Sequence, residues 1–408
     1  MTGFDVNQLR SHFPALDSQI AFFDSPGGTQ TPRHVAEAIA RTLTAPLSNR
    51  GTRSLSERNA EQAVAAFRAA YADFLGADPA GIVYGRSATQ LTYDFSRHLG
   101  RSWGPGDEVV VTRLDHDSNI RPWVQAAERT GTHVRWVDFD PETGELDAEQ
   151  LESVLGPRTR LVALTAASNL IGTVPDVRAA AEAAHRAGAL VYVDGVHFAA
   201  HRLVDLAALG ADFFVCSPYK FLGPHCAVLA ADPQLLESIV PDKLLPSTNE
   251  VPERFEYGTL PYEVMAGAAA AVDFLAGLGG DAEADLTRRE RLHRAHKLVG
   301  GHEHQLAEEI LASCRSRFGD DVVVHSRAAD RTPTLLLSFP GRRAAEVSAL
   351  LYEDGVHAPA GSFYAYEAFQ RLGIDDDGAL RLGVAPYTSA EDVQRLLSGL
   401  ERALVTLS

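Results

Sequence analysis

Short apolar runs alternate with amphipathic segments between about residue 80 and residue 232. Segments such as Val124–Arg129 and Ala179–Ala187 have the apolar spacing of helices, and the runs between such segments predict seven buried strands. The predicted strands are Ile82–Tyr84, Glu108–Val111, His133–Val137, Leu161–Thr165, Leu190–Val193, Phe213–Cys216 and Cys226–Ala231. Strands that alternate with helices indicate an α/β fold with a mostly parallel seven-stranded sheet. Such a sheet binds ligands at the carboxyl ends of its strands.

The pattern becomes helical after residue 262 and then changes to a mixture of strands and helices. The predicted elements are Glu263–Leu278, Ala282–Ser316, Val322–His325, Thr334–Phe339, Ala344–Glu353 and Ala390–Leu404. We therefore expect a large domain at residues 31–280 and a small C-terminal α+β domain at residues 281–408. Residues 1–30 are expected to pack against the small domain, because apolar side chains such as Phe13 and Phe23 need partners.

Composition and charge narrow the class of protein. The 408 residues are 45% apolar, and their net charge of −17 argues against nucleic acid and anionic membranes, which bind basic faces. Cys216, Cys226 and Cys314 lack the spacing of metal ligands, so we expect no metal. The N-terminus carries charges at Asp5 and Arg10 and lacks the apolar core of a signal peptide. No run is apolar enough to span a bilayer, and we expect a cytoplasmic protein.

Three loops after predicted strands carry polar residues. Ser87, Ala88 and Thr89 precede a predicted helix, whose free N–H groups favour a phosphate, although a plain helix cap is the more common explanation of such a loop taken alone. His116 follows the second strand and Asn169 follows the fourth. Helix capping for the histidine and turn formation for the asparagine are the alternatives to a binding role.

Two further loops place a carboxylate and an amine after apolar strands. Asp194 ends a buried strand, where a carboxylate is costly without a cationic partner, and a protonated pyridine nitrogen would supply one. Lys220 lies among apolar and aromatic residues, where desolvation lowers the pKa of an amine and suits it to Schiff-base chemistry.

Asp194 followed by Lys220 twenty-six residues later resembles the class V aminotransferase and cysteine desulfurase family. The resemblance extends over nearly the whole chain. It implies fold type I and pyridoxal 5'-phosphate (PLP) as cofactor, with Lys220 as the lysine that carries PLP. It also implies that Asp194 keeps the pyridine nitrogen protonated, which makes the ring an electron sink. Lys220, His116 and Asp194 are the catalytic residues that it suggests.

The resemblance implies further contacts to the cofactor. His116 matches the histidine that lies over the ring, and Asn169 matches the asparagine near the 3-oxygen. His197 stands where desulfurases usually have glutamine and several relatives have histidine.

Five positions match the phosphate-binding part of the family's site. They are Ser87, Ala88, Thr89, Ser217 and Tyr219. Ala88 departs from the family pattern because it lacks a hydroxyl group, so a backbone N–H is expected to serve there. Tyr219 stands in place of a histidine, and its phenol can still donate to a phosphate.

Other matching segments predict substrate contacts and a homodimer. The segment Arg-Phe-Glu-Tyr-Gly-Thr ends at Thr259, which in the family reaches the phosphate in the neighbouring subunit. Arg381 matches the arginine that binds the substrate α-carboxylate, where two parallel hydrogen bonds favour arginine. Asn49 and Arg50 match a segment on the substrate side, and Gly27 is expected to widen the substrate pocket or to serve a turn.

The sequence lacks the nucleophilic cysteine of desulfurases. In the family this cysteine lies in a small-domain loop before the carboxylate-binding arginine, and the corresponding stretch here is Ala358–Tyr364. Cys216 and Cys226 flank the lysine motif and are expected to pack within strands. Desulfuration through a persulfide is therefore not expected.

The remaining chemistry takes place at the α- and β-carbons of an amino acid. Cysteine-free members of the family include C–S lyases, so the leading hypothesis is β-elimination from an S-substituted cysteine. Phe363, Tyr364 and Tyr366 provide aromatic side chains for a roomier pocket, or else for core packing. An aminotransferase, an epimerase and an oxidative decarboxylase are the alternatives, and a PLP-binding regulator is a further one from another class.

Overall fold

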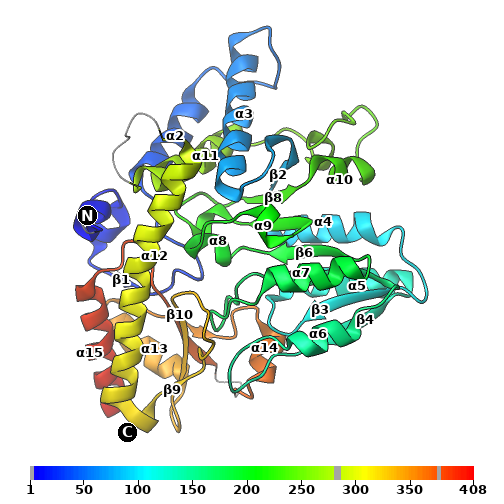
Figure 1. The fold of residues 1–408 in the computed structure, drawn as a ribbon. Coiled ribbons are helices and arrows are strands. Elements are labelled where there is room, and N and C mark those ends of the chain that lie inside the picture. Colours follow the sequence, from blue (N-terminus) through cyan, green and yellow to red (C-terminus); the bar gives the residue numbers. More distant parts are fainter. Residues whose placement is uncertain (1–3, 280–285, 375–377) are drawn as a thin grey trace.

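A seven-stranded sheet forms the centre of the larger part of the molecule (Figure 1). The structure, a computed structural model, describes residues 4–279, 286–374 and 378–408. The strands lie in the order β2 (Ile82–Gly85), β8 (Ala227–Ala231), β7 (Phe213–Cys216), β6 (Leu190–Asp194), β5 (Thr159–Thr165), β3 (Glu108–Thr112) and β4 (His133–Val137). Only β8 within this sheet runs antiparallel to its neighbours. The predicted α/β class is confirmed.

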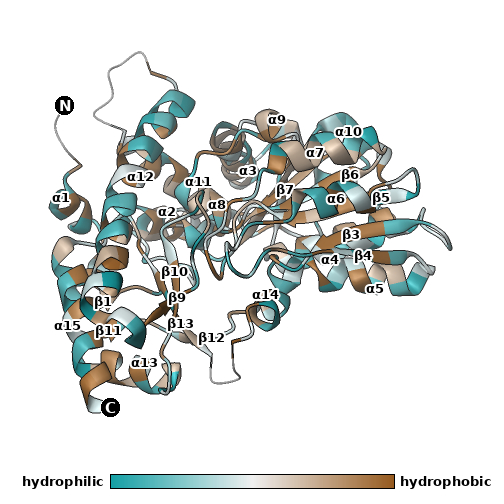
Figure 2. Cartoon of the chain, turned by 60° about the horizontal axis from the view of Figure 1, so that its bottom comes forward, coloured by the Kyte–Doolittle hydropathy of each residue, from teal (hydrophilic) through white to brown (hydrophobic). Residues whose placement is uncertain are grey.

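Helices cover both faces of this sheet, and adjacent residues of one strand contact opposite layers. Val110, Val162 and Val191 share a core with α3 (Leu55–Leu75), α7 (Val177–Arg186) and α11 (Tyr262–Gly277). Val109, Leu161 and Tyr192 share another with α4 (Ala88–Gly100) and α5 (Arg121–Thr130). This alternation follows from the two-residue period of a strand. Burial on both faces explains why the strand sequences are almost continuously apolar, as Figure 2 shows for β3.

The other helices of this part are mostly short. They are α1 (Val6–Arg10), α2 (Arg33–Thr44), α6 (Ala148–Val154), α8 (Phe198–His201), α9 (Leu206–Leu209) and α10 (Pro233–Ser238). No helix in the described ranges is both long and apolar enough to cross a bilayer.

A smaller antiparallel sheet forms the C-terminal part. Its order is β12 (Ala360–Gly361), β13 (Ala379–Gly383), β10 (Thr334–Ser338) and β9 (Val323–Val324). The helices of this part are α12 (Arg288–Ser313), α13 (Ala344–Glu353), α14 (Tyr366–Arg371) and α15 (Ala390–Thr406). Residues of α12, α13 and α15 share a separate apolar core with β10 and β13.

The N-terminal segment contacts both parts of the molecule. Strand β1 (Ala21–Phe22) pairs in parallel with β11 (Val356–His357), and Phe23 lies in the C-terminal core. Phe13 instead packs against the rings of Phe274 and Tyr387, at centroid distances of 5.8 and 5.1 Å, within the core of the large sheet. The predicted boundary between residues 280 and 281 lies outside the described residues, and the division into domains stays a prediction.

Tight packing fixes the turn that follows β6. The Gly195 N–H donates to the Val215 carbonyl at 2.9 Å, which holds this turn against β7. A Cβ on Gly195 would lie 1.8 Å from the ring of Phe214, which is fully buried. The position therefore requires glycine because of space, and its neighbour Asp194 is placed by the same contact.

We predict that Gly195→Ala lowers the free energy of unfolding by about 1–3 kcal/mol, because a side chain forced into a packed core displaces its neighbours. Gly277→Ala is the matched control, because no atom lies within 4 Å of its added Cβ, at the end of α11. That control should leave stability unchanged or raise it by about 0.5 kcal/mol, since alanine is the better helix former. Denaturant unfolding compares both variants, and equal stabilities would contradict the packing argument.

Candidate active site at the carboxyl ends of the strands

Ten of the eleven predicted cofactor-binding residues line one cavity. They are Ser87, Ala88, Thr89, His116, Asn169, Asp194, His197, Ser217, Tyr219 and Lys220. They come from loops after β2, β3, β5, β6 and β7, as the topology of a mostly parallel sheet requires. Ser118, Thr165, Ala167 and Val196 complete the lining. These four residues were not predicted from the sequence, because small uncharged side chains do not indicate a particular chemical role.

A second cavity of about 670 Å³ shares six lining residues with the first and opens toward the C-terminal part. Its additional lining includes Arg381, Phe363 and Tyr364 from the C-terminal part and Gly27 from the N-terminal segment. Two of the predicted substrate-side residues, Gly27 and Arg381, therefore lie beside the predicted cofactor site. We call this second space the outer cavity.

Asp194 is a buried carboxylate at the end of β6. Burial raises the pKa of its carboxyl group to about 6, against the lowering effects of a hydrogen bond from the Val196 N–H, at 2.9 Å, and of the positive charge of Lys220. The carboxylate thus lies in a desolvated site, where the protein only partly offsets the cost of burying its negative charge. A cationic ligand group would relieve this cost.

Lys220 is a partly buried amine that follows β7. Desolvation, aided by the nearby Arg381 and opposed by Asp194, lowers the pKa of its amino group to about 7. The Nζ atom donates to the Pro26 carbonyl and lies 5.1 Å from the centroid of the Tyr219 ring. A lysine whose pKa is this low is a nucleophile at neutral pH.

A second buried carboxyl group, on Asp115, lies near Asp194 and was not singled out by the sequence analysis. It accepts hydrogen bonds from the Thr112 hydroxyl and from Asn119 Nδ2, the latter at 2.7 Å. Burial, aided by the charge of Asp194 and opposed by these hydrogen bonds, raises the pKa of Asp115 to about 8. The available signal was its place directly after an apolar strand, before His116.

His116 is held as a neutral imidazole beside the cavity. Its Nδ1 accepts a hydrogen bond from the Ser118 N–H at 3.1 Å, so the neutral ring carries its proton on Nε2. Burial lowers the pKa of this ring to about 4. The ring of Tyr364 stacks on it at 5.7 Å between centroids. His116 therefore stays uncharged at neutral pH.

The predicted phosphate end lies at the start of α4. The Ser87 hydroxyl accepts a hydrogen bond from the Gln90 N–H at 3.1 Å, so this serine is a helix cap, which was the alternative interpretation. The cap and an anion site are compatible, because Ser87 and Thr89 line the cavity and the hydroxyl proton remains available to donate. Tyr219 lies parallel to His225, with centroids 4.8 Å apart.

Asn169 lines both cavities, and Arg381 lines the outer cavity beside it. The Arg381 side chain is buried, and its Nη1 donates to the Asn169 carbonyl at 2.9 Å. Burial lowers the pKa of this guanidinium to about 9. Its Nε and the Asn169 Oδ1 are buried without a hydrogen-bond partner among the described residues. Buried polar atoms of this kind are rare in proteins and indicate a ligand site.

His197 connects this site to the C-terminal sheet. Its Nε2 lies 3.0 Å from the Thr332 hydroxyl and 2.9 Å from the Thr334 hydroxyl. Burial lowers the pKa of the His197 ring. The imidazole thus lines the cavity while its outer nitrogen contacts β10.

Three predicted residues do not reach either cavity of this chain. Asn49 and Thr259 are exposed. Arg50 pairs with Glu61 at 2.8 Å and with Glu253 at 3.1 Å, and the Glu61 hydrogen bond raises the pKa of its guanidinium. Within one subunit, its charge is therefore satisfied by these two carboxylates and does not contact a substrate in the outer cavity.

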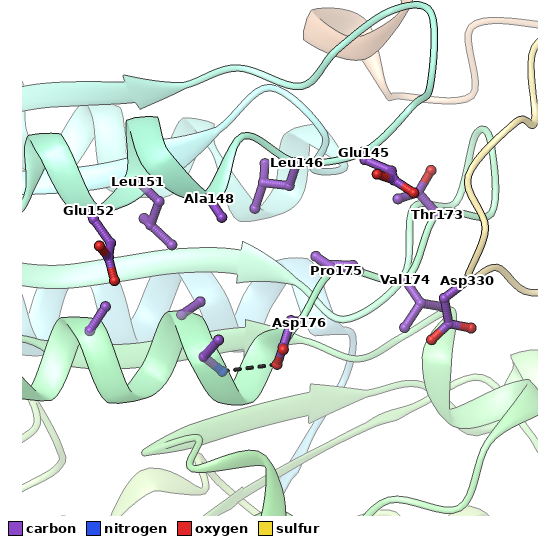
Figure 3. Close-up of a pocket in the computed structure, with 13 residues that line it drawn as sticks. Glu145, Leu146, Ala148, Leu151, Glu152, Thr173, Val174, Pro175, Asp176 and Asp330 are labelled. Atoms are coloured by element: carbon purple, nitrogen blue, oxygen red, sulfur yellow. Dashed lines mark hydrogen bonds between the residues drawn. The ribbon is translucent and has the colours of Figure 1, made fainter.

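Another cavity, of about 220 Å³, lies away from these residues and holds none of the predicted chemistry (Figure 3). Its walls combine apolar side chains such as Leu146 and Leu151 with carboxylates, including Asp176. Asp176 caps α7 by accepting from the Ala179 N–H at 2.9 Å. This carboxylate therefore has a structural partner.

The sequence pattern of the aminotransferase class-V family matches residues 21–396. The chain belongs to this family. As a member of this family, it is a PLP-dependent enzyme of fold type I, a transferase or a C–S lyase.

Relatives of this class-V enzyme have different names. A probable cysteine desulfurase of Pseudomonas aeruginosa is 32% identical over 419 residues, which cover 98% of each chain. An aminotransferase-like protein of Gibberella zeae is 31% identical and covers 99% of each chain. The crystal structure of the cysteine desulfurase CsdA from Escherichia coli is 27% identical, with a TM-score of 0.86 over 99% of this chain and 100% of that one.

We predict that covalent incorporation of PLP into the cofactor-free enzyme accelerates as the pH rises, with a midpoint near 7. Only the neutral amine attacks an aldehyde, and burial lowers the pKa of Lys220 to about 7. Absorbance of the bound cofactor follows the reaction, and borohydride reduction with peptide mapping identifies the modified lysine.

The chain offers simple controls for this experiment, because Lys243 and Lys297 are its only other lysines. Lys297 is exposed, and Lys297→Ala should incorporate PLP like the wild type. Lys220→Ala should not. A midpoint near 10, the range of an exposed lysine, would contradict the role of burial.

Proposed function

We propose that this enzyme is a C–S β-lyase, which converts an S-substituted cysteine and water into a thiol, pyruvate and ammonia. The observation that carries the proposal is the lining of the outer cavity. Phe363 and Tyr364 lie there beside Arg381, in the segment where a desulfurase has its nucleophilic cysteine. The relatives named cysteine desulfurases act on a cysteine, and an enzyme without the acceptor thiol needs another outcome for such a substrate.

The cysteines of the chain are unsuited to accept sulfur. Cys216, Cys226 and Cys314 are unpaired and buried, and none of them lines either cavity of the site. Burial raises the pKa of the Cys216 and Cys226 thiols, which keeps them protonated. Unpaired cysteines also fit the reducing cytoplasm, where we place the enzyme.

The residues of the first cavity, which contains Asp194 and Lys220, fit PLP. Asp194 offers a buried carboxylate for the pyridine nitrogen, and Lys220 offers a nucleophilic amine for the aldehyde. Ser87 and Thr89 at the start of α4, together with Ser217, offer donors for the phosphate. The unpartnered Asn169 Oδ1 lies on the same wall. We propose that these residues hold the cofactor, with His116 and His197 beside the ring.

Bound PLP draws electrons from the bonds at the substrate α-carbon and so acidifies the α-proton. Lys220 Nζ, whose pKa of about 7 leaves the amine largely neutral above that pH, would accept this proton. Asp194 would stabilise a positive charge at the ring nitrogen. Arg381 binds the substrate α-carboxylate and fixes the α-carbon near Lys220. The β-carbon–sulfur bond then breaks with its electron pair on sulfur, and the thiolate leaves.

We also propose a homodimer in which Thr259 serves the site of the neighbouring subunit. Thr259 is exposed, and the preceding stretch exposes the apolar side chains of Leu244 and Leu245, by 69% and 98%. Arg50 pairs with Glu253 of the same stretch. Arg50 is thus tied to the stretch that leads to Thr259, which fits a shared site built partly from these residues.

The proposed reaction predicts equal amounts of thiol and pyruvate from S-alkyl cysteines at neutral pH. Lys220→Ala should lower the rate by at least about 100-fold, because it removes the acid–base group. A thiol reagent and coupled lactate dehydrogenase quantify the two products, and the cofactor spectrum is recorded in the same samples. Accumulation of the pyridoxamine form without thiol would identify an aminotransferase instead, and exchange of the α-proton without either product would identify an epimerase.

A further inference from the structure

The backbone between β12 and α14 has an unusual conformation beside the outer cavity. Phe363 and Tyr364 have φ angles of 56° and 57°, in the left-handed region that side chains other than glycine rarely adopt. Two such residues in succession persist only where surrounding contacts hold them. The strained pair therefore indicates that a contact at the site depends on the backbone conformation of these two residues.

Two hydrogen bonds from loops of the large sheet hold the pair. Asn169 Nδ2 donates to the Phe363 carbonyl at 2.9 Å, and the Asp117 N–H donates to the Tyr364 carbonyl at 2.7 Å. Immediately after the pair, Glu367 forms ion pairs with Arg113 and Arg121, which also belong to the large-sheet part. The segment is thus fastened to the large-sheet part at the strained residues and directly after them.

The conformation places the Phe363 ring against a buried cation. The guanidinium carbon of Arg381 lies 3.8 Å from the centroid of this ring. At this distance the planar guanidinium rests on the aromatic face, while Nη1 donates to the Asn169 carbonyl. Asn169 therefore holds both partners, the ring through its side chain and the cation through its backbone. Among the described residues, Asp24 is the carboxylate whose charge acts on Arg381 and raises the pKa of its guanidinium, but no hydrogen bond joins the two side chains.

We propose that Phe363 is a positioning residue for Arg381, which fixes the plane of the guanidinium so that it selects a substrate bearing an α-carboxylate. Recognition of a carboxylate by two parallel hydrogen bonds requires a fixed guanidinium plane, and arginine otherwise rotates about several bonds. The stack supplies this restraint without neutralising the charge, as an acidic partner would. The inference rests on the carboxylate-binding role proposed for Arg381 and is independent of the fate of the C–S bond.

Core packing alone does not explain Phe363. The ring is only partly buried: one part of it packs against the apolar cluster that includes Leu114 and Ile171, and the ring also lines the outer cavity. An aliphatic side chain would pack against the same neighbours. The aromatic face is what the contact with the cation requires.

The test compares two probes that differ only in charge, 3-(methylthio)propanoate and 3-(methylthio)propan-1-ol. Binding to the PLP-loaded enzyme is measured by calorimetry. We expect Phe363→Leu to bind the carboxylate about 10-fold more weakly and the alcohol equally well, because only the charged probe uses the guanidinium. Phe363→Tyr keeps the ring and should stay within about twofold of the wild type. Steady-state kinetics should show a higher KM for the amino-acid substrate and little change in kcat.

Tyr366→Leu is the matched control, because this aromatic residue in the same segment is 55% exposed and lines neither cavity of the site. It should bind both probes like the wild type. Equal carboxylate affinity of Phe363→Leu and the wild type would overturn the proposal, and so would an equal loss for both probes. If Arg381→Ala kept the carboxylate affinity, the role of Arg381 would fail as well. A preserved carboxylate preference without thiol release from S-alkyl cysteines would overturn only the C–S lyase assignment.

Discussion

Desolvation of charge at the ends of the strands is the constraint on which the site depends. Asp194 and Arg381 are buried and Lys220 is partly buried, and desolvation is the largest influence on the pKa of each. It raises the pKa of the acid and lowers the pKa of both bases, so it acts against charge in each case. The attraction between Asp194 and Lys220 does not offset it, and the positive charge of Arg381 acts against a charge on Lys220. A zwitterionic substrate and a cofactor with a cationic ring and an anionic phosphate carry the charges that such a site lacks.

The two sheets contribute different chemistry to this site. Asp194 ends β6, and Lys220 follows the adjacent strand β7. The pairing of these two strands brings the two residues to the same edge of the large sheet. The smaller sheet brings Arg381 on β13, and the segment before it brings Phe363. Contacts between the two parts, such as that of His197 with Thr334, hold the proposed cofactor and carboxylate sites at a fixed distance. The proposed catalysis on an amino acid would thus depend on packing between the sheets, as well as on either sheet alone.

Much of this arrangement could be predicted from local sequence, and the rest depends on contacts that a sequence does not show. Apolar periodicity located all seven strands of the large sheet, and their order made the loops with Asp194 and Lys220 neighbours. The long helix α3 was not predicted, although Ser54 and Glu57 form the capping box at its start. The partners of Arg50 could not be predicted, because Glu253 is 203 residues away. The stack of Phe363 on Arg381 involves a left-handed backbone at residue 363. A phenylalanine in the sequence does not indicate such a backbone.

The segment before Arg381 decides which reaction this fold performs, because the cofactor site is common to many reactions. A cysteine there would bring a nucleophile to the sulfur of the substrate. Phe363 instead brings a ring that cannot react and that rests on the carboxylate-binding arginine. The left-handed backbone of Phe363 accompanies this contact. Hydrogen bonds from Asn169 and Asp117 to the carbonyl groups of Phe363 and Tyr364 hold that backbone in place. The segment that lacks the sulfur acceptor is therefore the one proposed to hold the carboxylate-binding arginine in place, an arrangement that fits the proposed cleavage within the substrate better than transfer of its sulfur to the enzyme.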